Sequence, residues 1–342
     1  MTPKRILYLG AQSGTCLDRA RAYQRLGHAV THLDPRKLLP STPWIERITW
    51  RLGGHWFAPL LQRQLSVQLQ GQQFDLCHVD CGEWVTPATI ALLKRHAQKV
   101  INYCIDDPTG PRDGRRFAAY RKALPDYDLV VVMRDLNVVE ARNLGAKNIF
   151  RVFMSADEQS HAPRPLTGVD LKRWRADVLF LGTWMPERGP FMLELVRAGV
   201  PLTIQGAHWN KAPEWSELSA YWRGGPIGGD DYAKAIQCAR INLGLLSKGN
   251  RDMHTTRSME IPALGALLCA ERTAEHQALY CEGTEALFWE NAEECAAICI
   301  DLLKQESKLM SLAQAGHQRY LASAHSNQKM LSNVLQQLEA AS

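Results

Sequence analysis

Charged side chains are concentrated in the stretch RDMHTTRSMEIPALG (251–265), directly before the apolar run ALLCAE. Arg257 and Glu260 are three residues apart, so in a helix they lie near one face of the first turn. Pro262 and Gly265 predict a short helix here, because proline tolerates an early helical position and glycine suits the stop. A guanidinium at a helix start can bind phosphate, and a carboxylate can accept hydrogen bonds from sugar hydroxyls. The alternative is a plain surface ion pair, worth under about 1 kcal/mol.

Two other loops that follow expected strands also carry cations. Arg188 comes after ADVLFLG, at the start of a predicted helix, and Lys248 comes after RINLGLL. The carboxyl ends of parallel strands meet at one edge of a sheet, so both should approach Arg257 there. Three cations at such an edge predict a pyrophosphate site that needs no metal. For Arg188 taken alone, a solvated surface position is the more common alternative.

The first half of the chain offers carboxylates instead. Asp106 and Asp107 follow the apolar run KVINYCI, and His78, Asp80 and Glu83 are placed similarly after FDLC. A carboxylate at a strand end can position an acceptor hydroxyl or accept its proton. An Asp-Asp-Pro sequence is equally well explained as a turn or a helix cap.

Strands and helices alternate along both halves, which predicts an α/β fold with two largely parallel, doubly wound sheets. The polar stretch 155–175 contains prolines and a glycine and is typical of a linker. The expected organisation therefore has four parts: an acceptor-binding domain over 1–160, a linker over 161–175, a nucleotide-binding domain over 176–322 and a final helical segment over 323–342.

Composition excludes several classes of protein. The 342 residues suit two domains, and no apolar run approaches the length of a membrane-spanning helix. A net charge of +5 without a long basic run favours a small anionic ligand over nucleic acid. The nine scattered cysteines are typical of reduced cytoplasmic thiols. Cys77 and Cys81 lack a second ligand pair, so we expect no metal site. The loop from Gly10 to Gly14 lacks a full dinucleotide-binding pattern, so we expect no nicotinamide cofactor.

The segment ERITWRLGGHWFAPLLQRQL (46–65) interleaves Trp50, Trp56 and Phe57 with arginines. It could contact an acceptor or the surface of a membrane. The alternative interpretation is a helix packed inside the first domain.

Several of these motifs together resemble one family. R-D-x-x-T-T-R-x-x-E-I-P-A-x-G, FDLCHVD, Asp-Asp-Pro after KVINYCI and VLFLGTWMPERG are similar to the GT-B glycosyltransferases, in particular to the CgeB-related subgroup. The resemblance covers most of the chain. It implies two Rossmann-like domains that face a central cleft, with the acceptor bound by the first domain and a nucleotide-sugar by the second. It also implies that the last helix returns to the first domain.

The resemblance assigns roles to individual residues. Retaining enzymes of this fold carry two acids separated by seven residues, which correspond to Asp252 and Glu260. It implies that Glu260 contacts the ribose and Asp252 the donor sugar or phosphate. Arg188 corresponds to one diphosphate-binding residue, while Thr183 stands where the other basic residue is expected. Four more residues are implied contacts of the donor: Gly14, Gly182, Gly206 and Lys248.

The combined expectation is a metal-independent, retaining glycosyltransferase that uses a UDP-sugar as co-substrate and needs no other cofactor. Its acceptor could be a glycan, a lipid, a protein or a small molecule. Arg257, Asp252, Asp106 and Asp107 are the expected catalytic residues. Two alternatives stay open: a nucleotide-binding regulatory or scaffold protein without turnover, and a nucleotide-sugar epimerase.

Overall fold

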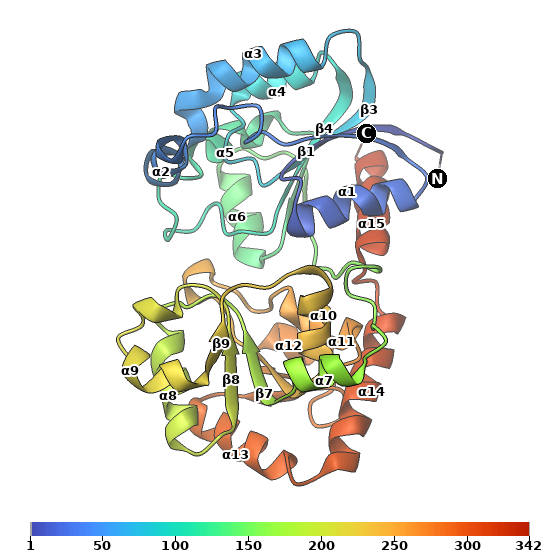
Figure 1. Cartoon of the computed structure of the whole chain (residues 1–342). Coiled ribbons are helices and arrows are strands. Elements are labelled where there is room, and N and C mark those ends of the chain that lie inside the picture. The colour runs from blue at the N-terminus through green and yellow to red at the C-terminus, as the bar shows by residue number, and fades with distance from the viewer. Residues whose placement is uncertain (1, 342) are drawn as a thin grey trace. The chain divides into compact units, whose positions relative to one another are not determined.

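The computed structural model describes residues 2–341, except for the side chain of Glu46. The chain forms two compact units (Figure 1). The first contains the residues up to Phe153, the segment Gly249–Arg251 and the chain from Asn327 onward. The second contains Met154–Lys248 and Asp252–Ser326. The stretch 161–175, expected to be a linker, is part of the second unit.

That stretch is ordered by a helix that we did not expect. Helix α7 (Gly168–Trp174) begins at Thr167, whose side chain accepts a hydrogen bond from the backbone of Asp170, while Asp170 binds back to the backbone of Thr167. This reciprocal capping box satisfies two donors at the helix start. The polar composition of the stretch therefore reflects an exposed helix and its cap.

The first unit is built on a parallel sheet of six strands in the order β2-β1-β3-β4-β5-β6. Its elements are β1 (Arg5–Leu9), α1 (Gly14–Arg25), β2 (Ala29–Leu33), α2 (Pro43–Leu52), η1 (Gly54–Phe57), α3 (Ala58–Gln68), β3 (Phe74–Asp80), α4 (Pro87–Leu93), β4 (Ala97–Cys104), α5 (Ala118–Ala123), η2 (Leu124–Asp126), β5 (Leu129–Val132), α6 (Asp135–Asn143), β6 (Ile149–Arg151) and α15 (Asn327–Ala340). The final helix α15 packs against α1, far from it in sequence (Figure 1).

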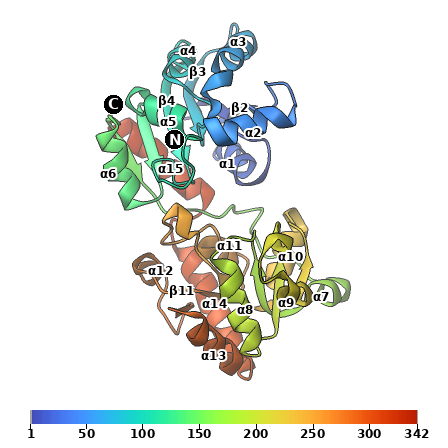
Figure 2. The ribbon, with the colours of Figure 1, turned by 90° about the vertical axis from the view of Figure 1, so that its left-hand side faces the viewer.

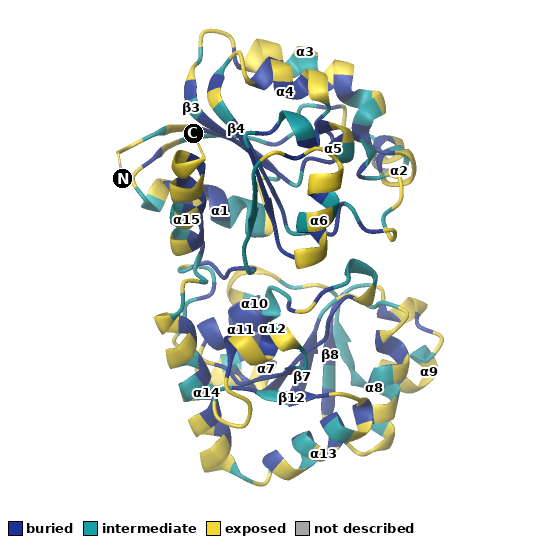
Figure 3. Cartoon of the chain, turned by 180° about the vertical axis from the view of Figure 1, so that it is seen from behind, coloured by how far each residue is buried: buried dark blue, intermediate teal, exposed yellow. Residues whose placement is uncertain are grey.

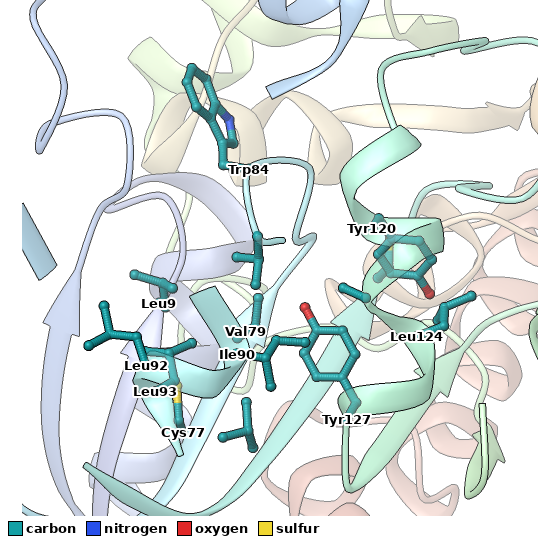
Figure 4. Packing of buried hydrophobic residues seen from close by; sticks show 14 of the residues in the cluster. Leu9, Cys77, Val79, Trp84, Ile90, Leu92, Leu93, Tyr120, Leu124 and Tyr127 are labelled. Atoms are coloured by element: carbon teal, nitrogen blue, oxygen red, sulfur yellow. The ribbon is translucent and has the colours of Figure 1, made fainter. Parts of the chain in front are cut away.

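One face of this sheet carries a large apolar core. Leu9 of β1 and Val79 of β3 meet Ile90 of α4 and Tyr127 there, and all four are buried (Figure 4). Strands that are covered on both faces read as continuous apolar runs, which is why β1, β4 and β5 were recognisable in the sequence.

The second unit repeats the architecture with the strand order β12-β11-β10-β7-β8-β9, again all parallel. Its elements are α7, β7 (Ala176–Leu181), α8 (Arg188–Arg197), β8 (Leu202–Gln205), η3 (Trp209–Lys211), α9 (Trp215–Leu218), η4 (Ser219–Tyr221), β9 (Trp222–Gly224), α10 (Gly229–Gln237), β10 (Ala239–Gly244), η5 (Lys248–Asn250, which continues into the first unit), α11 (Arg257–Ala263), β11 (Leu268–Glu271), α12 (Ala274–Leu279), β12 (Leu287–Trp289), α13 (Ala292–Leu302) and α14 (Glu306–Ala322). Helix α14 lies beside α11 and α13 (Figure 2).

The helices of the second unit bury one side each. In α14, Leu309, Leu312 and Tyr320 are buried, whereas Met310 is exposed, and the alternation is visible along the ribbon (Figure 3). The predicted two doubly wound α/β sheets are thus confirmed. The sequence missed the short edge strand β9, because three half-buried residues give too short a pattern to recognise. No helix within residues 2–341 is both long and apolar enough to cross a bilayer.

Candidate active site

The second sheet reverses its strand order between β7 and β10, and Arg188 spans this switch point. Its Nη1 donates to the carbonyl oxygen of Thr183 at 2.8 Å, after β7. Its Nη2 donates to the carbonyls of Leu245 and Leu246 at 3.3 Å each, after β10. In open α/β sheets, ligands bind outside the carboxyl ends of the strands at such a point. Arg188 therefore organises the loops on which a ligand would rest.

Arg188 is also a buried charge without a direct ion-pair partner among the described residues. Its residue is 7% exposed, and no carboxylate of the described chain lies within ion-pair distance. Burial lowers the pKa of the Arg188 guanidinium to about 10; Arg257 acts in the same direction, whereas the carboxylates of Glu187, Asp252 and Glu271 offset this only in part. It stays protonated at neutral pH, so an incoming anion would relieve an unfavourable buried charge. The alternative of a solvated surface arginine is wrong.

The two glycines of this edge are required by close approach. A Cβ on Gly206 would lie 2.0 Å from the carbonyl oxygen of Gly182, and the φ angle of Gly206 is +151°. A Cβ on Gly182 would lie 2.7 Å from the ring of Phe180. Trp209 donates from Nε1 to the Gly182 carbonyl at 2.9 Å. The loops after β7 and β8 are thus packed backbone to backbone.

Arg257 and Glu260 form the ion pair expected at the start of α11. Nη1 of Arg257 lies 3.0 Å from Oε2 of Glu260, and the Arg257 Nε donates to the Leu181 carbonyl at the end of β7. The Tyr232 hydroxyl also donates to Oε2 of Glu260, and His161 Nε2 is 3.6 Å from Oε1. Arg257 therefore links the pair to the same strand edge as Arg188.

Glu260 is ionised in this cluster. Burial alone would raise the pKa of its carboxyl, but Arg257 first, then His161 and Tyr232, hold that pKa below the ordinary glutamate value. Its Oε1 makes no hydrogen bond to a described side chain. An ionised carboxylate with an oxygen that makes no hydrogen bond can accept hydrogen bonds from ligand hydroxyls.

Pro262 occupies a different place in α11 from the one we expected. It is the sixth of the seven residues, inside the helix, where it removes a backbone donor. The carbonyl of Ser258, which that donor would have reached, instead accepts the Tyr280 hydroxyl at 2.7 Å. Gly265, with a φ angle of +73°, ends the helix as predicted.

We expect Tyr280→Phe to lower the free energy of unfolding by roughly 1–3 kcal/mol, because it leaves the buried Ser258 carbonyl without its partner. Tyr320→Phe is the matched control. Tyr320 is also buried in the same unit, but its hydroxyl has no hydrogen-bond partner among the described residues. Urea unfolding of both variants checks this, and equal losses would contradict the assigned role of Tyr280.

The remaining residues expected at the donor site are less exposed to a ligand or already paired. The ammonium of Lys248 contacts Glu271, which neutralises its charge. Asp252 is buried, and its charge acts on Arg188. Three cations were expected to converge. The charge of Arg257 acts on Arg188, whereas Lys248 forms an ion pair with Glu271.

The first unit has its own switch point, between β1 and β3, and a pocket of about 200 Å³ opens there. Three carboxylates line it: Asp80, Glu83 and Asp106. Arg19 pairs with Asp80 at 2.8 Å, both buried, and holds the pKa of Asp80 below its ordinary value despite burial. The charge of Asp80 is therefore already balanced by a buried ion pair.

The carboxylate of Glu83 is similarly engaged. It accepts hydrogen bonds from Arg116 at 2.6 Å, from Trp84 Nε1 at 2.9 Å and from Arg36 at 3.2 Å. Arg116, then Trp84 and Arg36, hold the pKa of Glu83 below the ordinary value, although burial acts in the opposite direction. Glu83 is thus a fixed anion that is already compensated.

Asp106 differs from these two neighbours. Its nearest cation is Arg116, at 3.4 Å, and the side chain keeps 29% of its surface exposed. Burial raises the pKa of Asp106, and Arg116 offsets this only in part. A carboxylate with a raised pKa, lining a pocket, is suited to accept a proton from a ligand.

Asp107 has a structural role instead. It is buried, and Arg251 binds both of its oxygens, at 2.6 and 2.8 Å. Asn137 donates to it at 2.6 Å, and a Cβ on Gly110 would collide with it at 2.2 Å. Arg251 also pairs with Glu140 at 2.7 Å. The equal treatment of Asp106 and Asp107 in the sequence is therefore not supported by their surroundings.

The structure adds residues that the sequence did not suggest. His161 and Tyr232 contact Glu260, but His161 lies in the stretch interpreted as a linker and Tyr232 in an ordinary amphipathic helix.

Gly14, the remaining predicted donor contact, starts α1 in the first unit with a φ angle of +53°. Nothing else in the structure tests a ligand role for it. His78 is fully buried among aromatic rings.

Three of the nine cysteines, expected to be scattered, lie close together. Cys269, Cys295 and Cys299 are buried in the core of the second unit, with their Sγ atoms all within 4.8 Å of one another. All nine cysteines are free. Buried free thiols pack as small apolar groups.

Comparison with known proteins places these features in a wider context. Residues 188–336 match a family model described as glycosyl transferase-like. No curated protein matches the chain significantly. Among solved structures, sucrose-phosphate synthase from Thermosynechococcus elongatus is 14% identical with a TM-score of 0.70, over 99% of this chain and 100% of that one.

Two further structures are similar over their full length. Anabaena HepE, solved with UDP and glucose, is 12% identical with a TM-score of 0.66, over 98% of this chain and 100% of that one. Trehalose 6-phosphate synthase from Burkholderia multivorans is 12% identical with a TM-score of 0.66, over 99% of each chain. The chain therefore has the GT-B fold. The fold and the family match together support glycosyltransferase activity.

Proposed function

We propose that the protein transfers a sugar from a UDP-sugar to an acceptor hydroxyl, with the donor bound by the second unit and the acceptor by the first. The observation that carries the donor half is the buried, unpaired charge of Arg188 at the switch point of the second sheet, beside the Arg257–Glu260 pair. The choice of UDP is supported by HepE, which was solved with UDP and glucose.

Each donor residue would act through a property described above. Arg257 contributes a half-buried guanidinium at the strand edge, and Arg188 a positive field from beneath the loops. Both stabilise the charge that develops on the departing diphosphate. Glu260 accepts hydrogen bonds from ribose hydroxyls through Oε1. Because cationic side chains supply this stabilisation, we propose that no metal ion is needed.

On the acceptor side, Asp106 orients the acceptor hydroxyl and accepts its proton. The hydroxyl oxygen bonds to the anomeric carbon of the donor sugar as the bond from that carbon to the diphosphate breaks and UDP leaves. We extend the proposal to retention of anomeric configuration and to the CgeB-related subgroup, on the spacing of Asp252 and Glu260 and the motifs quoted above. The nine free cysteines favour a reducing compartment such as the cytoplasm. The direct test of function is UDP release from a panel of UDP-sugars; binding without release would favour a regulatory protein.

We expect Glu260→Gln to weaken UDP binding about 10-fold or more and to leave pyrophosphate binding nearly unchanged. A hydrogen bond to a charged group contributes roughly 1.5–3 kcal/mol, and the amide loses that charge. Arg257→Gln should weaken both ligands, because it acts on the diphosphate. Isothermal titration calorimetry with UDP and with pyrophosphate measures both effects.

Glu194→Gln is the control, since Glu194 is an exposed acid on α8 of the same unit. Thermal unfolding of Glu260→Gln without ligand establishes that the variant is folded before it is titrated. An unchanged UDP affinity in the folded Glu260→Gln variant would mean that Glu260 does not bind the ribose, and the proposed donor site would be misplaced.

A further inference from the structure

A second pocket of the first unit adjoins the one that contains Asp106. It has a volume of about 560 Å³ and shares Arg36, Glu83 and Trp84 with its neighbour. Its other lining residues are Pro43, Arg47, Thr49, Trp50 and Arg51, all on helix α2. This volume is within the usual range for a small-molecule site. The two pockets therefore adjoin each other and share part of their walls.

Two of the three arginines that line the second pocket lack an ion-pair partner among the described residues. Arg47 and Arg51 are exposed, and neither has an ion-pair partner among the described residues. They are four residues apart, so they project from one face of α2, about 6 Å apart along its axis. Two guanidinium groups at this spacing match the oxygens of a phosphate or carboxylate.

The carboxylate in the wall does not cancel this charge. Glu83 is already bound by Arg116, Arg36 and Trp84, so none of its hydrogen-bonding capacity is directed to Arg47 or Arg51. Arg116 also stacks on the ring of Trp50, 4.7 Å from its centroid, which fixes the side of the pocket nearest Asp106. Counting the lining alone, three arginines face one glutamate.

The lining also contains an unsatisfied polar group. Thr49 is 4% exposed, and its hydroxyl has no hydrogen-bond partner in the described part of the chain. A buried hydroxyl without a partner is unfavourable, so an oxygen brought by a ligand could supply what the protein does not. This observation is independent of the charge count and points to the same pocket.

We propose that the second pocket binds an anionic group, a phosphate or a carboxylate, of a small acceptor whose hydroxyl reaches Asp106 in the first pocket. The inference rests on the proposed function for its identification of the ligand as an acceptor. It goes beyond that function by naming the chemical class of the acceptor. Arg47 and Arg51 bind the anion, and Arg36, at the boundary of the two pockets, contacts both parts of the molecule.

Calorimetry with matched pairs of probes tests this in a buffer without phosphate. Glucose 6-phosphate and glycerol 3-phosphate represent the phosphate, glucuronate represents the carboxylate, and glucose and glycerol are the neutral counterparts. At least one anionic probe should bind 10-fold or more tightly than its neutral counterpart, and the stronger class identifies the group. Equal or absent binding of all anionic and neutral probes would overturn the proposal.

The variants Arg47→Gln and Arg51→Gln should each weaken the anionic probe about 10-fold, the scale of one charge-assisted hydrogen bond. Arg63→Gln is the matched control, because it removes one exposed charge from α3 and lies in neither pocket. An equal loss in Arg63→Gln would show a mere effect of net charge and would also overturn the proposal. UDP affinity should be unchanged in all three variants.

The UDP titration separates the two proposals. If the parent binds the anionic probe through Arg47 and Arg51 but does not bind UDP, the anion site stands and the proposed function fails. If the parent binds UDP and releases it from a UDP-sugar but no anionic probe binds, the function stands and the acceptor class assigned here is wrong.

Discussion

Replacement of Arg188 by alanine is expected to lower the free energy of unfolding by roughly 2–4 kcal/mol and to weaken UDP binding by 10-fold or more. The guanidinium donates to three backbone carbonyls, of Thr183, Leu245 and Leu246, that connect the ends of β7 and β10. Each buried acceptor left unsatisfied costs about 1–3 kcal/mol, with partial relief where water enters. The affinity falls because the loops lose their arrangement and the site loses its buried charge.

Arg197→Ala is the control for this experiment. Arg197 is on the last turn of the same helix, and its ion pair with Glu217 is exposed on both sides, so its removal should cost under about 1 kcal/mol. Urea unfolding measures stability, and calorimetry at low temperature measures UDP affinity. Where the alanine variant is too unstable to titrate, Arg188→Lys replaces it, because lysine keeps the positive charge and lacks the planar guanidinium that donates to several carbonyls. A stability loss in Arg188→Ala no larger than in Arg197→Ala would contradict the role described here.

The sequence suggested Arg188 either as a ligand contact or as a solvated surface arginine, and its burial excludes the second alternative. Its position at the start of a helix could be predicted, because the helix follows an apolar strand and a loop. Its burial could not be predicted, since the three carbonyls that it binds include two from the loop after β10, more than fifty residues later in the chain. Local patterns give the element that carries a side chain but not what that side chain meets.

The same limit separates Asp106 from Asp107. Both follow β4, and because they are neighbours in the sequence, both were predicted to be catalytic residues. Arg251, which binds Asp107, is 144 residues away in the chain and has a φ angle of +53°, uncommon for arginine. No periodicity signals such a contact. By contrast, both sheets were predictable because strands buried on two faces are continuously apolar and the helices between them are periodic.

His161 illustrates the other kind of miss. Its surroundings, SADEQSHAPRP, are polar and rich in prolines, which favoured a linker. In the structure His161 accepts the backbone N–H of Asp157 at 2.9 Å through Nδ1, which directs Nε2 toward Glu260. A single histidine in a polar segment carries no signal of this kind, because the partner that orients it and the acid that it faces are brought together by folding.

Asp106→Asn is expected to reduce the turnover number by about 10²–10⁴-fold, the usual contribution of general acid–base catalysis, and to leave UDP affinity unchanged. The amide has nearly the same shape, still fits beside Arg116 and cannot accept the proton of the acceptor hydroxyl. Asp126→Asn is the control, since Asp126 is in the same unit, lines neither of the two pockets described above and has no side-chain hydrogen bond or ion pair to another described residue. Steady-state kinetics with the acceptor class identified by the binding experiment measures both variants.

The pH dependence gives an independent test of Asp106. Only its ionised form accepts a proton, so the rate should rise with pH as the carboxyl deprotonates. Burial raises the pKa of Asp106, which places this rise above the value of about 3.9 for an exposed aspartate. Asp106→Asn should lose the rise along with most of the rate, whereas Asp106→Glu should keep the rise at a reduced rate. Turnover in Asp106→Asn within threefold of the parent, with the same acidic limb, would mean that another group accepts the proton and that Asp106 only lines the pocket.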